Sequence, residues 1–316
     1  MMREASVAVC ISLALMLPIF SGDAEAQELY KYRGTDGEWM YADRPPQDRR
    51  TVEIRALNAV QVQPTVTVFH RLVGREIRLF AQNDFYAPVE VELTLDELRN
   101  VTLPPPEQSL HFVLEPQSET LLLTFDALEY ATSPVIAYHY RYLPGDPESR
   151  HQPDQPYRAP FAVANSHVIS QVFPYATTHM TADAHYALDI VMPVGTHIYA
   201  ARGGTVFEVA STNFRGGLDA AQDGAAANLI RILHEDGTYS VYAHLNWNTI
   251  RVNPGDIVER GEYIADSGNT GFSSGPHLHF AVIRNAGMQP MSVPITLEGP
   301  NRTAIVPKMG STLTAY

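Results

Sequence analysis

Alternation of hydrophobic and polar residues predicts strands in two long stretches of the chain. The runs of each stretch alternate or are rich in β-branched and aromatic residues, and Gly, Pro, Asn and Asp turns separate them. The second stretch has no strong helical period, so we expect an all-β protein. The runs are residues 76–80, 88–95, 110–114, 120–125 and 135–142, then 186–191, 197–200, 205–209, 228–234, 239–244, 263–265 and 278–283.

Proline content marks the main domain boundary. Five prolines among polar residues predict a stiff, extended linker over 144–160. We expect residues 51–143 to form a β-sandwich-like domain, residues 161–300 a second β domain, and residues 301–316 a short frayed tail. Upstream, two aromatic strands around Asp36-Gly37 predict a small hairpin module over 27–50. This segment resembles a small module of unknown function found in exported bacterial proteins.

Residues 1–26 have the features of a secretory signal peptide. Arg3 precedes an apolar run, and Ala24-Glu25-Ala26 is a small-x-small cleavage site. We therefore expect a mature chain that begins at Gln27 and is periplasmic or secreted. The apolar run is shorter than the ~20 residues of a membrane span, so no stable membrane insertion is expected. Cys10 is the only cysteine, which leaves the mature chain without a disulfide.

Net charge excludes two classes of partner. The whole chain has 22 basic and 35 acidic residues. Removal of residues 1–26 takes away one basic and three acidic residues, which leaves a net charge of −11. A chain this acidic is a poor match for nucleic acid or for an anionic membrane surface.

Eight of the twelve histidines lie within residues 161–300, and two of them are only two positions apart. If residues 278–283 form a strand, His277 and His279 share one face, and Leu278 and Phe280 share the other. Two imidazoles on one face suggest a metal site or an acid/base pair. A pair of partly exposed histidines explains this triplet equally well.

Asp189 is a carboxylate inside an apolar run. A strand over 185–192 would place His185 and Asp189 on the same face. A buried carboxylate without a cation costs several kcal/mol or more, and a metal shared with His185 would supply that cation. An Asp that caps a turn before Pro193 is the alternative. His244 ends a third alternating run and, taken alone, is more simply a surface or packed histidine.

Taken together, these pieces resemble the lysostaphin-type (LytM-like) zinc endopeptidases of peptidoglycan. The resemblance covers about residues 165–295 and implies an antiparallel, duplicated-hybrid-like β-sheet domain with one Zn²⁺ per chain. It also implies that the zinc ligands are His185, Asp189 and His279, and that His244 and His277 are catalytic. The motifs are His-x-x-x-Asp at 185–189, Tyr-Ala-His-Leu at 242–245, Gly-Asn-Thr-Gly at 268–271 and Gly-Pro-His-Leu-His-Phe at 275–280.

By this resemblance, three protein ligands leave the fourth position of the zinc for a water, whose pKa the metal lowers. His277 would take the proton of that water, and His244 would stabilise the oxyanion and protonate the leaving amine. Which histidine has which role stays open. Two features depart from the family pattern: Ala187 replaces a usual Gly, and the Phe-Gly-x-Arg turn is absent. His179 is a rival first ligand, although it lacks the four-residue spacing to an Asp.

The leading hypothesis is a monomeric zinc endopeptidase that hydrolyses peptide cross-links of peptidoglycan in cell-wall remodelling. No carboxylate pair of the kind that cleaves sugars is apparent in the sequence. The alternative is a non-catalytic member of the same fold that activates a cell-wall amidase. Such members typically lack zinc ligands, whereas all five positions are filled here. A lipoyl- or biotin-carrier domain is excluded, because Lys31 and Lys308 are the only lysines and both lie outside residues 161–300.

Overall fold

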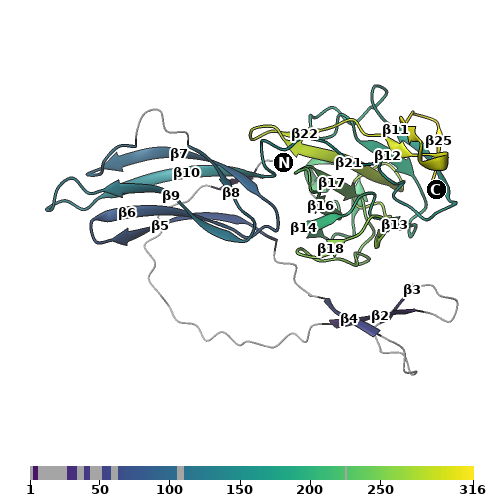
Figure 1. Cartoon of the computed structure of the whole chain (residues 1–316), viewed down its shortest axis with the longest axis horizontal. Helices are drawn as coiled ribbons and strands as arrows, with labels where there is room; N and C mark the ends of the chain where they lie inside the picture. The colour runs from purple at the N-terminus through teal and green to yellow at the C-terminus, as the bar shows by residue number, and fades with distance from the viewer. Residues whose placement is uncertain are drawn as a thin grey trace. The chain divides into compact units, whose positions relative to one another are not determined.

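The computed structural model of the protein describes residues 3–5, 27–33, 39–42, 52–57, 63–104, 110–224 and 226–316. These residues are almost entirely strands and turns, which confirms the predicted all-β fold (Figure 1). No helix in these ranges is long and apolar enough to cross a membrane. The chain separates into two compact units, residues 8–62 and residues 63–316 together with 1–7, and each is described by itself.

The smaller unit contains one antiparallel sheet in the order β3-β2-β4. Its strands are β2 (Gln27–Arg33), β3 (Trp39–Ala42) and β4 (Val52–Leu57). β2 and β3 pair as the hairpin expected around Asp36-Gly37, and β4 extends the sheet beyond residue 50. Of the predicted signal peptide only β1 (Arg3–Ala5) is described, paired with β10, and the cleavage site lies outside the described residues.

The larger unit begins with two sheets that share a core. Strict alternation in β6 buries Ile77, Leu79 and Ala81, and Val89 and Val91 of β7 contribute to the same core from the other sheet. This is the sandwich-like arrangement that the pattern predicts. One sheet has the order β5-β6-β9 and the other β1-β10-β7-β8. The strands are β5 (Val66–Val73), β6 (Glu76–Asn83), β7 (Val89–Arg99), β8 (His111–Leu114), β9 (Ser118–Asp126) and β10 (Val135–Pro144).

A long antiparallel sheet organises the rest of the unit, in the order β18-β14-β16-β17-β21-β12-β11-β25, with β22 also paired to β21. Its strands are β11 (Ser166–Gln171), β12 (Leu188–Val191), β14 (Gly204–Ala210), β16 (Leu229–Leu233), β17 (Tyr239–Ala243), β18 (Ile257–Val258), β21 (His277–Asn285), β22 (Pro290–Ser292) and β25 (Thr312–Thr314). β21 lies between β12 and β17, so it is the strand on which residues from both neighbours converge.

Smaller elements surround this sheet. β13 pairs with β19, β23 pairs with β24, and β15 pairs in parallel with β20. Their bounds are β13 (His197–Tyr199), β15 (Gly216–Gly217), α1 (Ala220–Asp223), β19 (Tyr263–Asp266), β20 (Gly271–Phe272), β23 (Leu297–Glu298), the 3-10 helix η1 (Pro300–Arg302) and β24 (Ala304–Ile305).

The two faces of β21 have different environments. Leu278 and Phe280 are fully buried in the core of the second domain, as the alternation predicts. Ala281 and Ile283, on the opposite face, belong to a core that is shared with the sandwich strands. The histidines at the start of β21 lie on this second face, beyond the point where apolar packing covers it.

A buried carboxylate ties the sandwich to β21. Glu90 of β7 accepts hydrogen bonds from Nδ2 of Asn285 and from the backbone N–H of Met288, both at 2.7 Å. Its other oxygen lies 3.1 Å from Nδ1 of His111. Each oxygen of this buried carboxylate therefore has a nitrogen partner, which is the usual condition for burying such a group. The sandwich is thus anchored to the strand that carries His277 and His279.

The proline-rich segment and the tail both pack against the second domain. Tyr157 and Phe161 are buried in its core, and Tyr157 exchanges backbone hydrogen bonds with Thr296 and Glu298. Residues 144–160, which were expected to form an extended linker, therefore pack against the second domain at Tyr157. At the other end β25 pairs with β11 and buries Leu313, so this tail is not frayed.

Candidate metal centre

Asp189 and His279 meet because β12 and β21 pair in a register that sets them opposite each other. Oδ1 of Asp189 lies 3.0 Å from Nδ1 of His279. Asp189 is almost fully buried, whereas His279 is half-buried. Burial favours a neutral carboxyl, but His179 and His279 outweigh that effect and hold the pKa of Asp189 well below its usual range. The centre therefore contains a buried negative charge.

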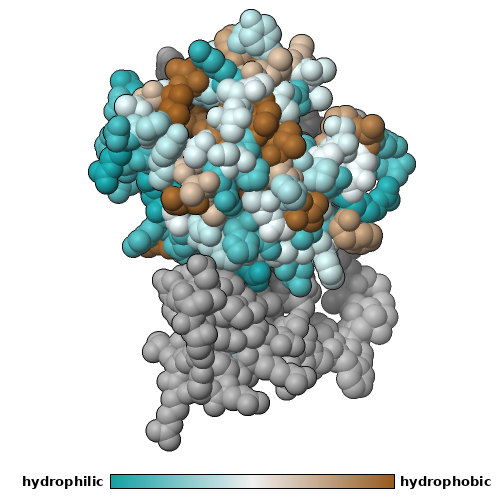
Figure 2. All heavy atoms as spheres, turned by 90° about the vertical axis from the view of Figure 1, so that its right-hand side faces the viewer, coloured by the Kyte–Doolittle hydropathy of each residue, from teal (hydrophilic) through white to brown (hydrophobic). Residues whose placement is uncertain are grey.

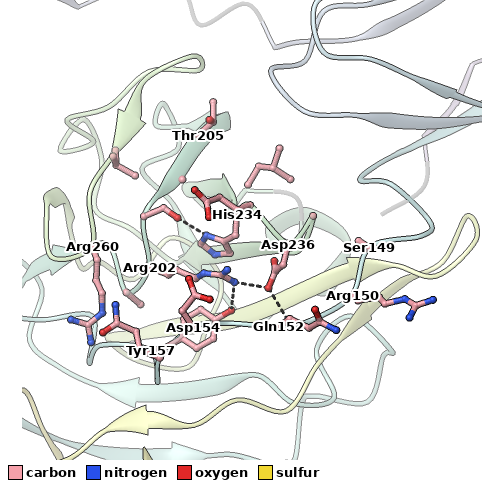
Figure 3. Close-up of a pocket in the computed structure, with 18 of the residues that line it drawn as sticks. Ser149, Arg150, Gln152, Asp154, Tyr157, Arg202, Thr205, His234, Asp236 and Arg260 are labelled. Carbon is pink, nitrogen blue, oxygen red and sulfur yellow. Dashed lines mark hydrogen bonds and ion pairs between the residues drawn. The ribbon is translucent and has the colours of Figure 1, made fainter. Parts of the chain in front are cut away.

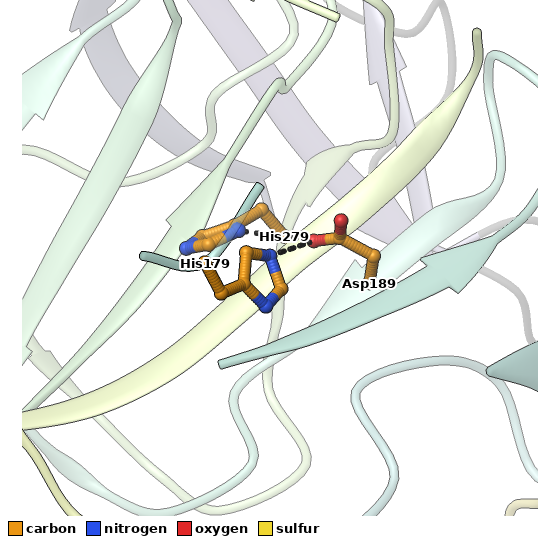
Figure 4. A group of neighbouring side chains, drawn as sticks. All are labelled: His179, Asp189 and His279. Carbon is orange, nitrogen blue, oxygen red and sulfur yellow. Dashed lines mark hydrogen bonds and ion pairs between the residues drawn. The ribbon is translucent and has the colours of Figure 1, made fainter. Parts of the chain in front are cut away.

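The third member is His179, from the long loop between β11 and β12 (Figure 4). Its Nε2 lies 3.1 Å from Oδ1 of Asp189, and its ring stands nearly perpendicular to that of His279. The ring is buried; among the described residues Nδ1 has no hydrogen-bond partner, and Nε2 faces the carboxylate of Asp189. A buried imidazole nitrogen this close to a carboxylate oxygen either donates a hydrogen to it or shares a cation with it.

These three side chains fit a metal ion. One nitrogen from each histidine and one carboxylate oxygen lie within 4.8 Å of one another. Two imidazoles and a carboxylate are a donor set that zinc uses in catalytic sites, where a fourth position stays open. A cation here would take one ligand atom from each of the three side chains and compensate the charge of Asp189. Within the described ranges this is the one such group of His, Cys, Asp and Glu residues.

His185 lies elsewhere, in contrast to the sequence prediction. Residues 182–186 form turns, and the strand begins only at Leu188, so the alternation that would align His185 with Asp189 does not hold. The ring of His185 is exposed and packs on Phe173 and Tyr186, with centroids 4.7 and 4.8 Å away. The structure thus brings together Asp189 and His279 of the predicted ligands and adds the rival His179.

Gln171 is a residue of this centre that the sequence analysis did not assign a role. Its Nε2 donates to Oδ2 of Asp189 at 2.7 Å. Its Oε1 accepts the backbone N–H groups of Thr177 and Thr178, immediately before His179. Gln171 therefore orients the carboxylate and holds the loop that delivers His179. The only sequence signal was that residues 171–175 stand near the place where the family's Phe-Gly-x-Arg turn is missing.

His244 and His277 stand beside the three candidate ligands. Nδ1 of His244 donates to the carbonyl of Thr270 at 2.7 Å, and Nδ1 of His277 donates to that of Gly275 at 2.8 Å. A carbonyl only accepts, so each Nδ1 carries the proton and each Nε2 is free as an acceptor. The two rings are 4.6 Å apart, and Nε2 of His277 lies 3.7 Å from Oδ1 of Asp189.

His244 is held in its neutral form. Burial, followed by the neighbouring His277 and His279, lowers its pKa to about 4. Its backbone is left-handed, with φ of 61°, which is uncommon for a residue other than glycine. At neutral pH this imidazole is therefore uncharged, and its Nε2 is available as an acceptor.

Apolar side chains border this region without forming one continuous surface. Phe173 and Met180, on the loop that carries His179, are 44% and 80% exposed. The space-filling view of one face shows apolar groups in separate patches among polar ones (Figure 2). Met180, next to His179 in the chain, is therefore an exposed side chain that a bound chain could contact.

A cavity of about 1020 Å³ lies away from these histidines, at the opposite end of β16 and β17 (Figure 3). Arg202 lines this cavity. Its Nη1 lies 2.6 Å from Oδ2 of Asp236 and also donates to the hydroxyl of Tyr157. His234 is buried at its edge and donates from Nδ1 to the carbonyl of Gly203. None of the five residues around the candidate metal centre lines this cavity.

Burial of His234 predicts a loss of stability in acid. Burial lowers its pKa to about 4, whereas an unfolded histidine titrates near 6.5. As the pH falls from about 6.5 to 4, the unfolded chain binds a proton that the folded chain does not. The free energy of unfolding should therefore fall across this window, by about 3 kcal/mol from this residue, and be unaffected above it.

The measurement is urea unfolding at several pH values for the natural chain and for His234→Asn. The variant should be less stable at pH 7 but have a shallower slope between pH 6.5 and 4. Arg202, Asp236 and His151 act on the same ring and remain unchanged in the variant. Identical slopes in the two proteins would contradict the assignment.

Comparison with known proteins gives one family. Residues 183–291 match the profile described as Peptidase family M23. Asp189, His244, His277 and His279 lie inside the match, and His179 lies just before it.

The curated relatives are similar over this part of the chain. Glycyl-glycine endopeptidase ALE-1 of Staphylococcus capitis is 37% identical over 103 residues, which are 32% of this chain and 25% of that protein. Lysostaphin of Staphylococcus simulans is 35% identical over 103 residues, 32% of this chain and 18% of that protein. Peptidoglycan DD-endopeptidase ShyC of Vibrio cholerae is 32% identical over 132 residues, 42% of this chain and 27% of that protein. The chain thus spans about a quarter or less of the length of these relatives.

Proposed function

We propose that this chain, whose residues 183–291 form a domain of peptidase family M23, is a metal-dependent endopeptidase that hydrolyses peptide bonds of bacterial peptidoglycan. The observation that carries the proposal is the convergence of His179, Asp189 and His279 beside two histidines whose Nε2 atoms are free. The relatives named as glycyl-glycine and peptidoglycan DD-endopeptidases support this reaction class and this substrate.

One zinc ion per chain, held by His179, Asp189 and His279, fits the donor set best. The ion would supply a Lewis acid that polarises the scissile carbonyl and lowers the pKa of an attacking water. We assign the first ligand to His179 and not to His185, because only His179 is buried with a ring nitrogen 3.1 Å from Oδ1 of Asp189.

The histidines move the proton. As the water oxygen bonds to the carbonyl carbon, Nε2 of His277 takes the proton that the water loses, and the imidazolium returns it to the amine as the C–N bond breaks. Nδ1 of His277 stays hydrogen-bonded to Gly275, which keeps the ring oriented. His244 also has its proton on Nδ1, so it can donate to the oxyanion only when its Nε2 receives the proton that the water loses, directly or from the neighbouring ring of His277.

The substrate follows from location and chemistry together. The predicted signal peptide would deliver the mature protein to the compartment where peptidoglycan lies. A net charge of −11 opposes long-range attraction to anionic wall material, so recognition would be local. The exposed Met180, next to His179 in the chain, is available for such contacts.

The test is digestion of purified sacculi by the mature protein with added zinc, followed by mass spectrometry of the released fragments. Cleaved cross-links with intact glycan strands are expected. New sugar ends would exclude the proposed bond class. If zinc-loaded protein releases nothing but stimulates an added amidase, the protein is an activator and not a peptidase.

A further inference from the structure

The loop of residues 268–275 packs unusually closely against the segment that carries His244. A Cβ added at Gly268 would lie 2.6 Å from the backbone of Asn246, and one added at Gly271 would lie 2.7 Å from Ala227. Gly271 also has φ of 82°, which only glycine adopts readily. The two glycines therefore allow the loop to lie directly against the backbone of Asn246 on one side and of Ala227 on the other.

Thr270, between these glycines, supports His244 through both its carbonyl and its hydroxyl. Its carbonyl accepts Nδ1–H of His244 at 2.7 Å. Its hydroxyl donates to the carbonyl of Leu245, the next residue, at 2.8 Å, and accepts the backbone N–H of Asn228 at 3.0 Å. One residue thus holds both the ring of His244 and the backbone that follows it.

Asn228 completes this support. It is fully buried, its carbonyl accepts the N–H of Leu245 at 3.1 Å, and its Nδ2 donates to the carbonyl of Leu245 at 3.3 Å. His244 needs this support because a β-carbon makes its left-handed backbone unfavourable. Such a conformation persists only where the surrounding contacts determine it.

We infer that Thr270 is a positioning residue of His244: its carbonyl accepts Nδ1–H and so fixes the tautomer, and its hydroxyl holds that carbonyl in place against the backbone that follows His244, so that Nε2 faces the metal centre. Thr270 is 5% exposed, and its hydroxyl is hydrogen-bonded to the backbone of Asn228 and Leu245. It therefore acts through His244 and not on a substrate or metal. The inference deepens the proposed function and rests on it for its effect on turnover.

The matched variants are Thr270→Val, which keeps the shape and removes the hydroxyl, and Thr270→Ser, which keeps the hydroxyl. In the valine variant we expect about one zinc per chain, kcat lowered roughly 10- to 100-fold and KM changed little. The serine variant should recover most of kcat. Added to His244→Ala, the valine substitution should cause no further loss, because its effect passes through that ring.

A second readout needs no substrate. Long-range ¹H–¹⁵N NMR of the zinc-loaded protein should show His244 as the Nδ1–H tautomer in the natural chain and in Thr270→Ser. In Thr270→Val it should show a mixture. If the natural chain cleaves no peptide, the proposed function fails while the tautomer still tests the inference.

Three results would overturn the inference. They are an unchanged tautomer and kcat in Thr270→Val, equal losses in the valine and serine variants, or a further loss when the valine substitution is added to His244→Ala. If Thr270→Val does not fold, Asn228→Ala removes the neighbouring support and should shift the same tautomer. A fixed tautomer in that variant would equally count against the role.

Discussion

Alanine in place of His179 is expected to remove bound zinc and abolish hydrolysis of sacculi, whereas alanine in place of His185 should leave both nearly intact. His179 is buried and places Nε2 3.1 Å from Oδ1 of Asp189. His185 is exposed and contacts Phe173 and Tyr186. Loss of one of three ligands should weaken zinc binding by more than the roughly 10- to 100-fold typical of an outer-shell partner.

The measurement is zinc content after dialysis, together with fragment release from sacculi, for the two variants in parallel. His185→Ala is the matched control, because both residues lie in the segment between β11 and β12 and the same atoms are removed. If His179→Ala keeps its zinc and His185→Ala loses it, the first ligand is His185, as the His-x-x-x-Asp spacing indicates. Gln171→Ala should have an intermediate effect, since it removes the hydrogen bonds to Asp189 and to the loop.

Alanine at His244 or His277 is expected to leave about one zinc per chain but to lower the rate by roughly 10²- to 10⁴-fold, the range for general acid–base groups. Neither side chain is among the three donors that converge, yet each presents a free Nε2 beside them. The effects should be less than additive in the double variant, because both rings serve one proton path.

His197→Ala is the control for these two variants, since His197 is an exposed histidine of the same domain whose ring packs on Tyr263. It should retain both zinc and rate. Rates are compared under saturating zinc, so that a loss of metal cannot imitate a loss of proton transfer. Near-normal turnover in both His244→Ala and His277→Ala would remove them from the mechanism.

Features that depend on neighbours along the chain could be predicted from the sequence. The two-residue period of a strand is local, so the pattern of β21 placed Leu278 and Phe280 in the core and the two histidines on the other face. The same period indicated the sandwich strands, and two aromatic runs around Asp36-Gly37 indicated the small hairpin. The order of the motifs indicated the family, and with it Asp189 and His279 as partners, although only the pairing of β12 with β21 sets them opposite each other.

Features that depend on chain segments far apart could be read only from the tertiary structure. A loop has no period, so nothing in the sequence between residues 171 and 188 shows that His179 returns to Asp189 while His185 turns outward. Tyr157 binds the domain through Thr296 and Glu298, and β25 pairs with β11, although composition alone indicated a linker and a tail. The free energy of such contacts comes from burial and hydrogen bonds between distant segments, which local patterns do not encode.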